Sequence, residues 1–357
     1  ADPFDPVLKD GDMVARGAAD DKGQVYAHLK AIESLQRVSG ELPVNIKVLV
    51  EGEEEIGSPH LYGFLREYQD QCQADAILVS DTPFYSRTCP SICISLRGML
   101  YVEVTMTGPS ADLHSGQHGG AVANPIQGLA ALISQLKDDR SRIQIPGFYD
   151  AVTPIGASLQ ALLDALPDND AVYADSVGVS ELYGEQGYGA NAQKWFRPTL
   201  DCNGITGGYT GEGAKTIIPA TASAKLSMRL VDGQDPDEIF ASLTQYCQAH
   251  CPKGLNVKIK RHAGSKAYMA DPDAPVIQMG KRALEAAFEY PAKLVGEGGS
   301  IPIVSELSSQ LNAAVVLMGF NLPDDQIHAP NERFLVDHYY KGILATSLLM
   351  TALGGPK

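Results

Sequence analysis

A break in the pattern of apolar residues most constrains how this chain can fold. Short apolar runs alternate with helical patterns at the start of the sequence and again past about residue 267, whereas long alternating strands lie between them. Strands interleaved with helices indicate an α/β layer, and long alternating strands indicate an antiparallel sheet with one solvated face. We therefore expect an α+β domain over residues 97–267 to be inserted into an α/β domain made of residues 1–96 and 268–357.

The first domain should contain a mainly parallel sheet. Val44–Val50 and Ala76–Val79 are short apolar runs that predict buried strands. Before them, four apolar residues share one face of a predicted helix: Val25, Leu29, Ile32 and Leu35. In the last part of the chain we expect a helix over 274–290, a strand over 313–320 and a closing helix from about Glu332.

The inserted domain should contain an antiparallel sheet. Residues 100–106 and 222–230 alternate apolar and polar side chains, which predicts strands with one buried face. Asn124-Pro125 opens a helical pattern, because Asn is favoured at the N-cap and Pro at the first helical position. Residues 144–209 are rich in Gly, Asp and aromatics with little periodicity, so we expect a long excursion over the surface there.

Charge and cysteine usage narrow the class of protein. The 28 Lys and Arg against 43 Asp and Glu give 28 − 43 = −15, so the basic footprint that nucleic acids and anionic membranes require is absent. No apolar run approaches the roughly 20 residues of a membrane span. The six cysteines are sparse for 357 residues, which favours reduced thiols and a cytoplasmic protein.

Acidic residues gather where the predicted strands end. Glu51-Gly52-Glu53-Glu54-Glu55 follows Val44–Val50, Asp81 follows Ala76–Val79, and Asp20-Asp21 precedes a helix. Open α/β sheets place ligands at the carboxyl ends of their strands, and crowded carboxylates need cations to offset their repulsion. The alternatives are a solvated charge run, an N-cap for Asp20-Asp21 and a turn cap for Asp81.

Two histidines stand out among the eight. His328 lies in a polar loop after the last predicted strand, and carboxylates with an imidazole suit Zn²⁺, Mn²⁺ or Co²⁺ better than Ca²⁺. His114 lies in Gly-rich sequence after the first strand of the inserted domain, which separates it from the acidic cluster. Five others have no such context and are expected to be structural: His28, His60, His250, His262 and His338.

The ordered motifs resemble one enzyme family. The sequence contains ARGAADDKG, EGEEEIGS, SDT, DLHSG, GAKTIIP, SMRLV, GEGGSIP and HAPNE in that order. Together they resemble the carnosinase, aminoacylase, carboxypeptidase G and acetylornithine deacetylase family of dinuclear zinc metallopeptidases (clan MH), and within it the dipeptidase branch. The resemblance implies a zinc-exopeptidase-like catalytic domain and an inserted dimerisation, or lid, domain, and thus a homodimer.

The resemblance also implies a role for individual residues. Asp20 would bridge two divalent metal ions, which would be zinc, with manganese or cobalt as alternatives. Glu55 and His328 would complete one metal site, and Asp81 would belong to the other. Glu54 would be the general base that takes a proton from the attacking water and passes it to the leaving amine.

The remaining implied residues concern the substrate. His114 would reach from one subunit into the other's site and stabilise the oxyanion. Thr216, Arg229, Gly299 and Ser300 would hold the carboxylate end of the substrate, since a guanidinium pairs bidentately with a carboxylate. The alternation of its strand leaves open that Arg229 is only an outward-facing surface residue.

One departure from the family concerns the N-terminal side. The family carries a His-x-Asp pair upstream of the DDKG motif, and no His precedes Asp20. The chain therefore resembles a member without its N-terminal part. We expect the metal site of Asp81 to lack a ligand, so that this chain alone holds at most one metal tightly and is inactive or weakly active.

The resemblance favours hydrolysis of the amide bond of small peptides. Relatives with Asp at the position of Asp81 tend to be dipeptidases or aminopeptidases. The alternatives are an N-acyl amino acid deacylase and a non-catalytic dimeric binding protein with the same fold. Retention of Glu54 beside Glu55 argues against the binding protein, which has no need of a general base.

Overall fold

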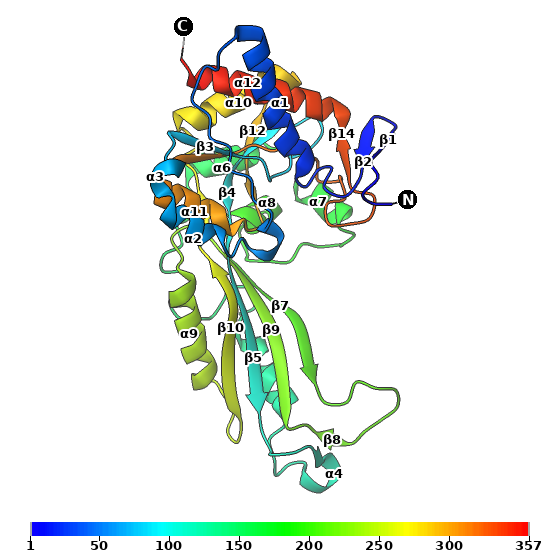
Figure 1. The fold of residues 1–357 in the computed structure, drawn as a ribbon. Helices are drawn as coiled ribbons and strands as arrows, with labels where there is room; N and C mark the ends of the chain where they lie inside the picture. The colour runs from blue at the N-terminus through cyan, green and yellow to red at the C-terminus, as the bar shows by residue number, and fades with distance from the viewer. Residues whose placement is uncertain (1, 356–357) are drawn as a thin grey trace.

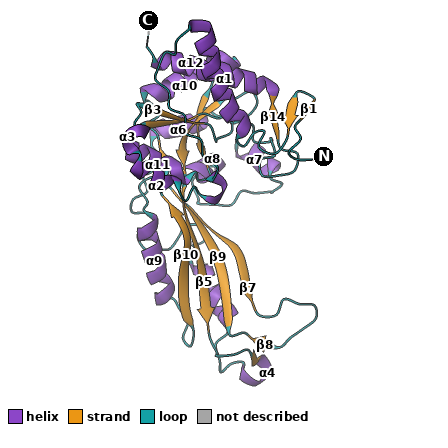
Figure 2. Ribbon diagram, in the orientation of Figure 1, coloured by secondary structure: helices purple, strands orange, loops and turns teal. Residues whose placement is uncertain are grey.

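The chain forms a helix-covered body from which a long antiparallel sheet extends as an arm (Figure 1). This computed structural model describes residues 2–355. Both ends of the chain lie on the body, and the coloured elements of Figure 2 show that most helices cover it. Among the described residues, no helix combines the length and the apolar character that crossing a membrane requires.

A five-stranded mixed sheet lies inside the body. Its strands are β3 (Ala76–Val79), β4 (Ser91–Leu96), β11 (Tyr268–Met269), β12 (Lys293–Glu297) and β13 (Ala314–Leu317). Parallel pairing joins β12 to β4 and β13 to β3, whereas β11 and β13 pair with β4 in the antiparallel sense. The predicted α/β class is confirmed, and antiparallel contacts link its parallel pairs.

Helices and a small sheet surround this core. The described elements are α1 (Lys22–Ser39), η1 (Glu54–Ile56), α2 (Leu61–Glu67), α3 (Gln69–Cys72), α10 (Pro275–Phe288), α11 (Pro302–Leu311) and α12 (Val336–Leu353), with β1 (Val7–Lys9), β2 (Asp12–Val14) and β14 (Arg333–Leu335). Helix α12 contacts both α1 and α10, and α11 contacts α2. The small sheet has the order β1-β2-β14, so a strand that directly precedes the last helix pairs with strands near the start of the chain.

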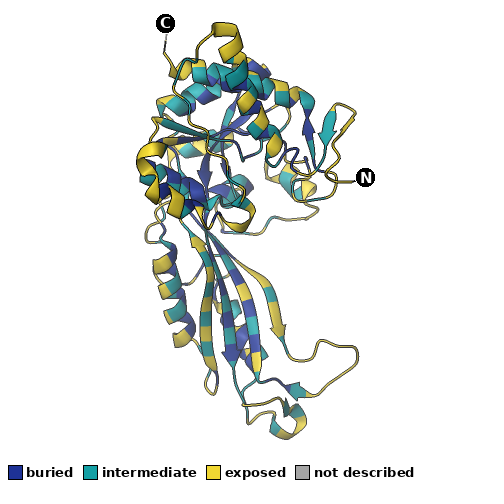
Figure 3. Cartoon of the chain, in the orientation of Figure 1, coloured by how far each residue is buried: buried dark blue, intermediate teal, exposed yellow. Residues whose placement is uncertain are grey.

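The arm is a four-stranded antiparallel sheet of order β10-β5-β9-β7. Its strands are β5 (Gly98–Thr107), β7 (Thr199–Gly207), β9 (Thr221–Leu230) and β10 (Asn256–Ser265). Helices α5 (Pro125–Gln135) and α9 (Pro236–Ala249) pack against this sheet. Side chains of β5 and β9 alternate between buried and more exposed (Figure 3), so both predicted strands are confirmed.

The far end of the arm carries three short elements. These are β6 (Leu113–His114), α4 (Ser115–His118) and β8 (Ile217–Ile218), and β6 pairs with β8. At the start of α5, the side chain of Asn124 accepts a hydrogen bond from the N–H of Ile126. The predicted helix start at Asn124-Pro125 is therefore confirmed.

The predicted strand at Val44–Val50 is wrong. Residues 45–50 form no strand, and Val48, Leu49 and Val50 are 56%, 47% and 63% exposed. An apolar run has the local propensity for a strand, but a strand also needs a partner for its backbone groups. No partner strand lies beside this run among residues 2–355.

The expectation for residues 144–209 is also wrong in part. The segment contains α6 (Ala157–Asp164), α7 (Asp170–Ser176), α8 (Ala190–Trp195) and the start of β7. Trp195 and Phe196 belong to the buried core of the body, so part of the segment packs inside. The boundaries of the expected domains stay a prediction.

The buried face of α1 also differs from the expected one. Gln24, Ala27 and Ala31 are its buried residues, whereas Leu29 is 42% exposed. Small side chains let α1 approach its neighbours closely, and the Gln24 amide is held by the backbone of Ala19 and Phe320. A buried polar side chain with such partners is not destabilising.

Candidate active site

His328, Asp20 and Glu55 meet at one point on the body. The Nε2 atom of His328 lies 2.8 Å from Oδ2 of Asp20 and 3.0 Å from Oε1 of Glu55. One ligand atom from each residue lies within 4.8 Å of the others, which suits a metal ion. Carboxylates with an imidazole are a donor set of zinc and similar transition metals.

The loop that carries Asp20 is held by Glu332. The Glu332 carboxylate, 2% exposed, accepts hydrogen bonds from the backbone N–H groups of Gly17, Ala19 and Asp20, each at 2.9 Å. Its Oε2 also accepts from Arg16 Nη1 at 2.7 Å. These bonds fix the backbone of Asp20 just before α1 begins.

Glu54 and Glu55 are presented by the single turn η1. Gly57 ends this turn at φ 83°, a left-handed conformation that glycine adopts without strain, and its N–H donates to the carbonyl of Glu54. Asp81 comes to the site from the end of β3. Burial, followed by the charges of Glu55 and Asp20, raises the pKa of Glu54.

Buried carboxylates crowd the site. Burial, followed by the charge of Glu54, raises the pKa of Asp81 to about 7. Burial, followed by the charge of Asp81, raises the pKa of Asp21 to about 9. The Asp21 side chain makes no N-cap bond to α1, and its Oδ1 is buried without a hydrogen-bond partner. Unpaired acidic oxygens of this kind fit a site for cations.

The charges of its neighbours also act on His328. Burial lowers its pKa, but the charges of Glu55 and Asp20 and their hydrogen bonds outweigh burial, so the pKa of His328 is raised. The residue has a left-handed backbone at φ 60°, which is uncommon outside glycine and is found at functional sites. The loop after β13 thus aims the imidazole at the carboxylates.

Arg229 and Ser300 form a second group at the junction of the arm and the body. Arg229 Nη1 donates to Ser300 Oγ at 2.7 Å. The N–H of Gly299 donates to Glu297 Oε1 at 3.0 Å, and the carbonyl of Gly299 accepts from the N–H of Arg97 at 3.2 Å. Three residues expected at the substrate's carboxylate end therefore lie together.

His114 and Thr216 form a third group at the far end of the arm. His114 Nε2 lies 3.1 Å from Thr216 Oγ1, and its Nδ1 accepts from the N–H of Gly116. The α4 and β8 elements beside them lie at the opposite end of the molecule from α1 and β14 (Figure 1). Within one chain, these two residues are not brought to the carboxylate cluster.

Comparison with known proteins decides the family. Peptidase family M20/M25/M40 matches residues 1–352. The chain belongs to this family. As an M20-type peptidase, it is a metal-dependent hydrolase of small peptides, and its relatives use divalent metal ions.

Several relatives of this peptidase are named for their substrates. The Cys-Gly metallodipeptidase of Schizosaccharomyces pombe is 33% identical over 353 residues, which cover 96% of this chain and 73% of that protein. The Beta-Ala-His dipeptidase of Rattus norvegicus is 28% identical and covers 96% of this chain and 70% of its own. A solved M20 family metallo-carboxypeptidase from Sulfolobus solfataricus has a TM-score of 0.86 at 31% identity and covers 98% of this chain and 79% of its own.

The sequence interpretation missed Glu332 and assigned no separate role to Asp21. Glu332 lies in the HAPNE motif four positions after His328, but its bonds to distant backbone groups leave no local pattern. Asp21 was predicted, with Asp20, to belong to the acidic cluster, and the alternative for both residues was an N-cap of the following helix. The unpaired buried oxygen of Asp21 argues against that alternative.

Proposed function

We propose that the chain is a zinc-dependent dipeptidase that works as a homodimer. The contact of His328 Nε2 with both Asp20 and Glu55 carries the proposal. Two carboxylates and an imidazole form a donor set that zinc accepts, and manganese or cobalt would fit the same atoms.

Two cation positions are supported by the arrangement of carboxylates. Asp20, Glu55 and His328 would hold one ion, and Asp81 with Asp20 would hold a second. Asp81 is not part of the described triad of Asp20, Glu55 and His328, so we expect the first position to bind its ion more tightly. Bound divalent ions would supply Lewis acidity, lowering the pKa of a water and polarising the substrate carbonyl.

Glu54 is proposed as the general base. Its carboxylate is half-shielded and has a raised pKa because of burial and the charges of Glu55 and Asp20. A carboxylate with a raised pKa can take a proton from the attacking water and give it to the leaving amine near neutral pH. Glu53, in contrast, is turned toward His60 at the surface.

Arg229 and Ser300 are proposed to bind the carboxylate end of the peptide. Their 2.7 Å hydrogen bond orients the guanidinium beside the Gly299 loop. An oriented guanidinium pairs with a carboxylate in a fixed geometry. The named substrates of two relatives, Cys-Gly and β-Ala-His, are dipeptides with such an end.

His114 is proposed to act in the site of the neighbouring subunit. The separation of α4 and β8 from the body in Figure 1 supports this, because His114 has no route to its own cluster without a large movement of the arm. In that position His114, next to Thr216, would donate a hydrogen bond to the oxyanion. We also propose a cytoplasmic location, since all six cysteines are unpaired thiols.

The test combines metal analysis with a panel of substrates. The purified chain is stripped with a chelator, reloaded with Zn²⁺, Mn²⁺ or Co²⁺, and assayed with dipeptides and N-acetyl amino acids. Because we expect the position beside Asp81 to lack an imidazole ligand, the hydrolysis of dipeptides should be weak. It should disappear on chelation and return with metal, most strongly with zinc. Bound metal with no hydrolysis of any amide would overturn the proposal, and cleavage of N-acetyl amino acids alone would reassign the substrate.

A further inference from the structure

A cationic pocket adjoins the Arg229–Ser300 pair. This cavity of about 230 Å³ is lined by Arg97 and Lys194 and by the first residues of β7, among them Thr199. It is smaller than the roughly 300–1,000 Å³ of sites that enclose a drug-sized ligand, so it suits one side chain better than a whole peptide.

The register of the arm places the pocket on the same side as Arg229. Thr199 and Met99 both pair directly with Arg229, so the three side chains share one face of the sheet. Arg97 lies two positions before Met99, and its Nε donates to the carbonyl of Gly298 at 3.0 Å. The pocket and the Ser300 loop are therefore neighbours.

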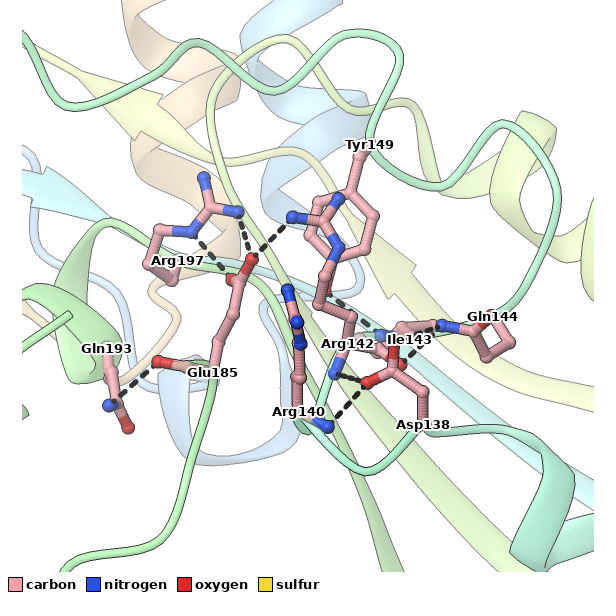
Figure 4. A network of polar contacts seen from close by, with 9 residues as sticks. All are labelled: Asp138, Arg140, Arg142, Ile143, Gln144, Tyr149, Glu185, Gln193 and Arg197. Atoms are coloured by element: carbon pink, nitrogen blue, oxygen red, sulfur yellow. Dashed lines mark hydrogen bonds and ion pairs between the residues drawn. The ribbon is translucent and has the colours of Figure 1, made fainter. Parts of the chain in front are cut away.

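Most charges around the pocket already have partners. Figure 4 shows the guanidinium groups of Arg197 and Arg142 directed at Glu185; Arg197 bonds it at 2.8 and 2.9 Å and Arg142 at 3.2 Å. Lys137 lies 3.9 Å from Asp201. These contacts neutralise two of the cationic side chains that line the cavity.

Arg97 and Lys194 differ from these cations because no carboxylate in the described part of the chain pairs with them. Neither forms an ion pair within residues 2–355, and Arg97 Nη1 is buried without a hydrogen-bond partner. The charge of Glu297 acts on both cations, but its Oε1 accepts a hydrogen bond from the N–H of Gly299 and forms no ion pair with either of them. Buried polar groups are nearly always paired, so an unpaired one needs a ligand or another explanation.

The positions of the two cations are held by their surroundings. Lys194 Nζ lies 3.9 Å from the centre of the Tyr173 ring. Burial lowers the pKa of Lys194, and burial, followed by the charge of Arg229, lowers the pKa of Arg97 to about 10. A carboxylate in the pocket would offset this desolvation and repulsion.

We propose that the pocket of Arg97 and Lys194 binds the side-chain carboxylate of an acidic residue at the C-terminal position of a dipeptide. The inference rests on the proposed function, in which Arg229 and Ser300 take the terminal carboxylate. A substrate such as Ala-Glu has a second carboxylate next to the first, and the two pairs of groups would hold one carboxylate each.

The test compares Ala-Glu with Ala-Gln, which has nearly the same shape and no side-chain charge. A charge-assisted hydrogen bond is worth enough for about a tenfold or greater preference in kcat/KM for Ala-Glu in the metal-loaded chain. Lys194→Gln should lower this ratio to near one, and Lys194→Arg should keep most of it. Lys253→Gln, a change at an exposed lysine, is the matched control.

A second variant and a measurement of stability show whether a lost preference comes from the pocket or from misfolding. Arg97→Gln should also lower the ratio, and thermal unfolding of each variant shows whether the fold is intact. Equal rates for both dipeptides in the unsubstituted chain, or an unchanged ratio in a folded Lys194→Gln variant, would overturn the inference and leave the proposed function standing. Failure to hydrolyse any dipeptide would instead overturn the proposed function, and the inference with it.

Discussion

The buried carboxylate of Glu332 accepts a hydrogen bond from the backbone N–H of Asp20 at 2.9 Å. The same carboxylate holds Gly17, Ala19 and Arg16. A residue near the end of the chain thereby sets the position of the loop that supplies the first candidate metal ligand, before α1 begins.

Glu332→Gln should therefore weaken both the fold and metal binding. An amide cannot accept all four hydrogen bonds and carries no charge, so we expect a loss of about 2–4 kcal/mol in the free energy of unfolding. Urea unfolding and a zinc titration measure the two effects. Glu67→Gln, at an exposed helical position, is the control; equal behaviour of the two variants would contradict this role.

Glu54→Gln should separate catalysis from metal binding. General-base help is worth about 10²–10⁴-fold, so kcat should fall by that factor while metal content stays the same. Metal content is measured by mass spectrometry of the desalted protein. Glu53→Gln, in the same acidic run, should retain most of the activity because Glu53 faces His60. Unchanged turnover in Glu54→Gln would remove this residue from the mechanism.

Mixing two inactive proteins should restore activity if His114 acts across a dimer. His114→Ala should lower kcat by about 10²–10³-fold, the usual cost of losing one oxyanion donor. A mixed dimer with Glu54→Gln contains one site with both groups intact, so activity should partly return on subunit exchange. Light scattering shows whether the proteins are dimers, and a mixture that exchanges subunits but stays inactive would contradict the prediction.

The buried imidazole of His28 should make stability depend on pH. Its ring lies 2.6 Å from Ser80 Oγ and 3.0 Å from Thr346 Oγ1, and burial lowers its pKa to about 4. In the unfolded chain, the imidazole of His28 has its ordinary pKa near 6.5. The contribution of the buried neutral ring to the free energy of unfolding is therefore complete above about pH 6.5 and is lost as the pH falls from about 6.5 to 4. The shift corresponds to about 3 kcal/mol at most.

Urea unfolding between pH 7.5 and 5 tests this with His28→Gln. The variant should be less stable than the unsubstituted chain at pH 7.5, and the difference should shrink as the pH falls. His60→Gln, at an exposed position, should keep the original pH dependence. If the difference in stability between the two proteins does not change with pH, His28 is not the source of the pH dependence.

Regular patterns predicted the parts of the fold that local physics decides. The alternation in β5 and β9 and the Asn124 cap of α5 are local features, and all three are present. Val44–Val50 failed because a strand depends on a partner that no local pattern reveals. The short helices α6 to α8 have too few turns for a clear period.

In the candidate site, too, residues marked by local sequence patterns could be predicted, and residues that act through distant contacts could not. Asp81 and His328 follow strands β3 and β13, so their meeting at one edge of the sheet could be expected from the sequence. Asp20 and Glu55 were expected beside them from the ordered motifs, since the run before Glu55 forms no strand. Glu332 could not, because its role consists of hydrogen bonds to backbone groups of a distant loop. Arg97 could not either, since its closeness to Arg229 follows from the pairing of β5 with β9, which sets Met99 opposite Arg229.

The outer edge of β3 has a consequence for how the molecules behave in concentrated solution. The five-stranded sheet ends on β3, which pairs only with β13 among the described strands, and the apolar side chains of Val48–Val50 are also exposed. Open edges and exposed apolar residues promote association between copies. The net charge of −15 opposes it through mutual repulsion. Because salt screens that repulsion beyond about 10 Å at 0.1 M, the colloidal stability of this protein depends on keeping ionic strength low.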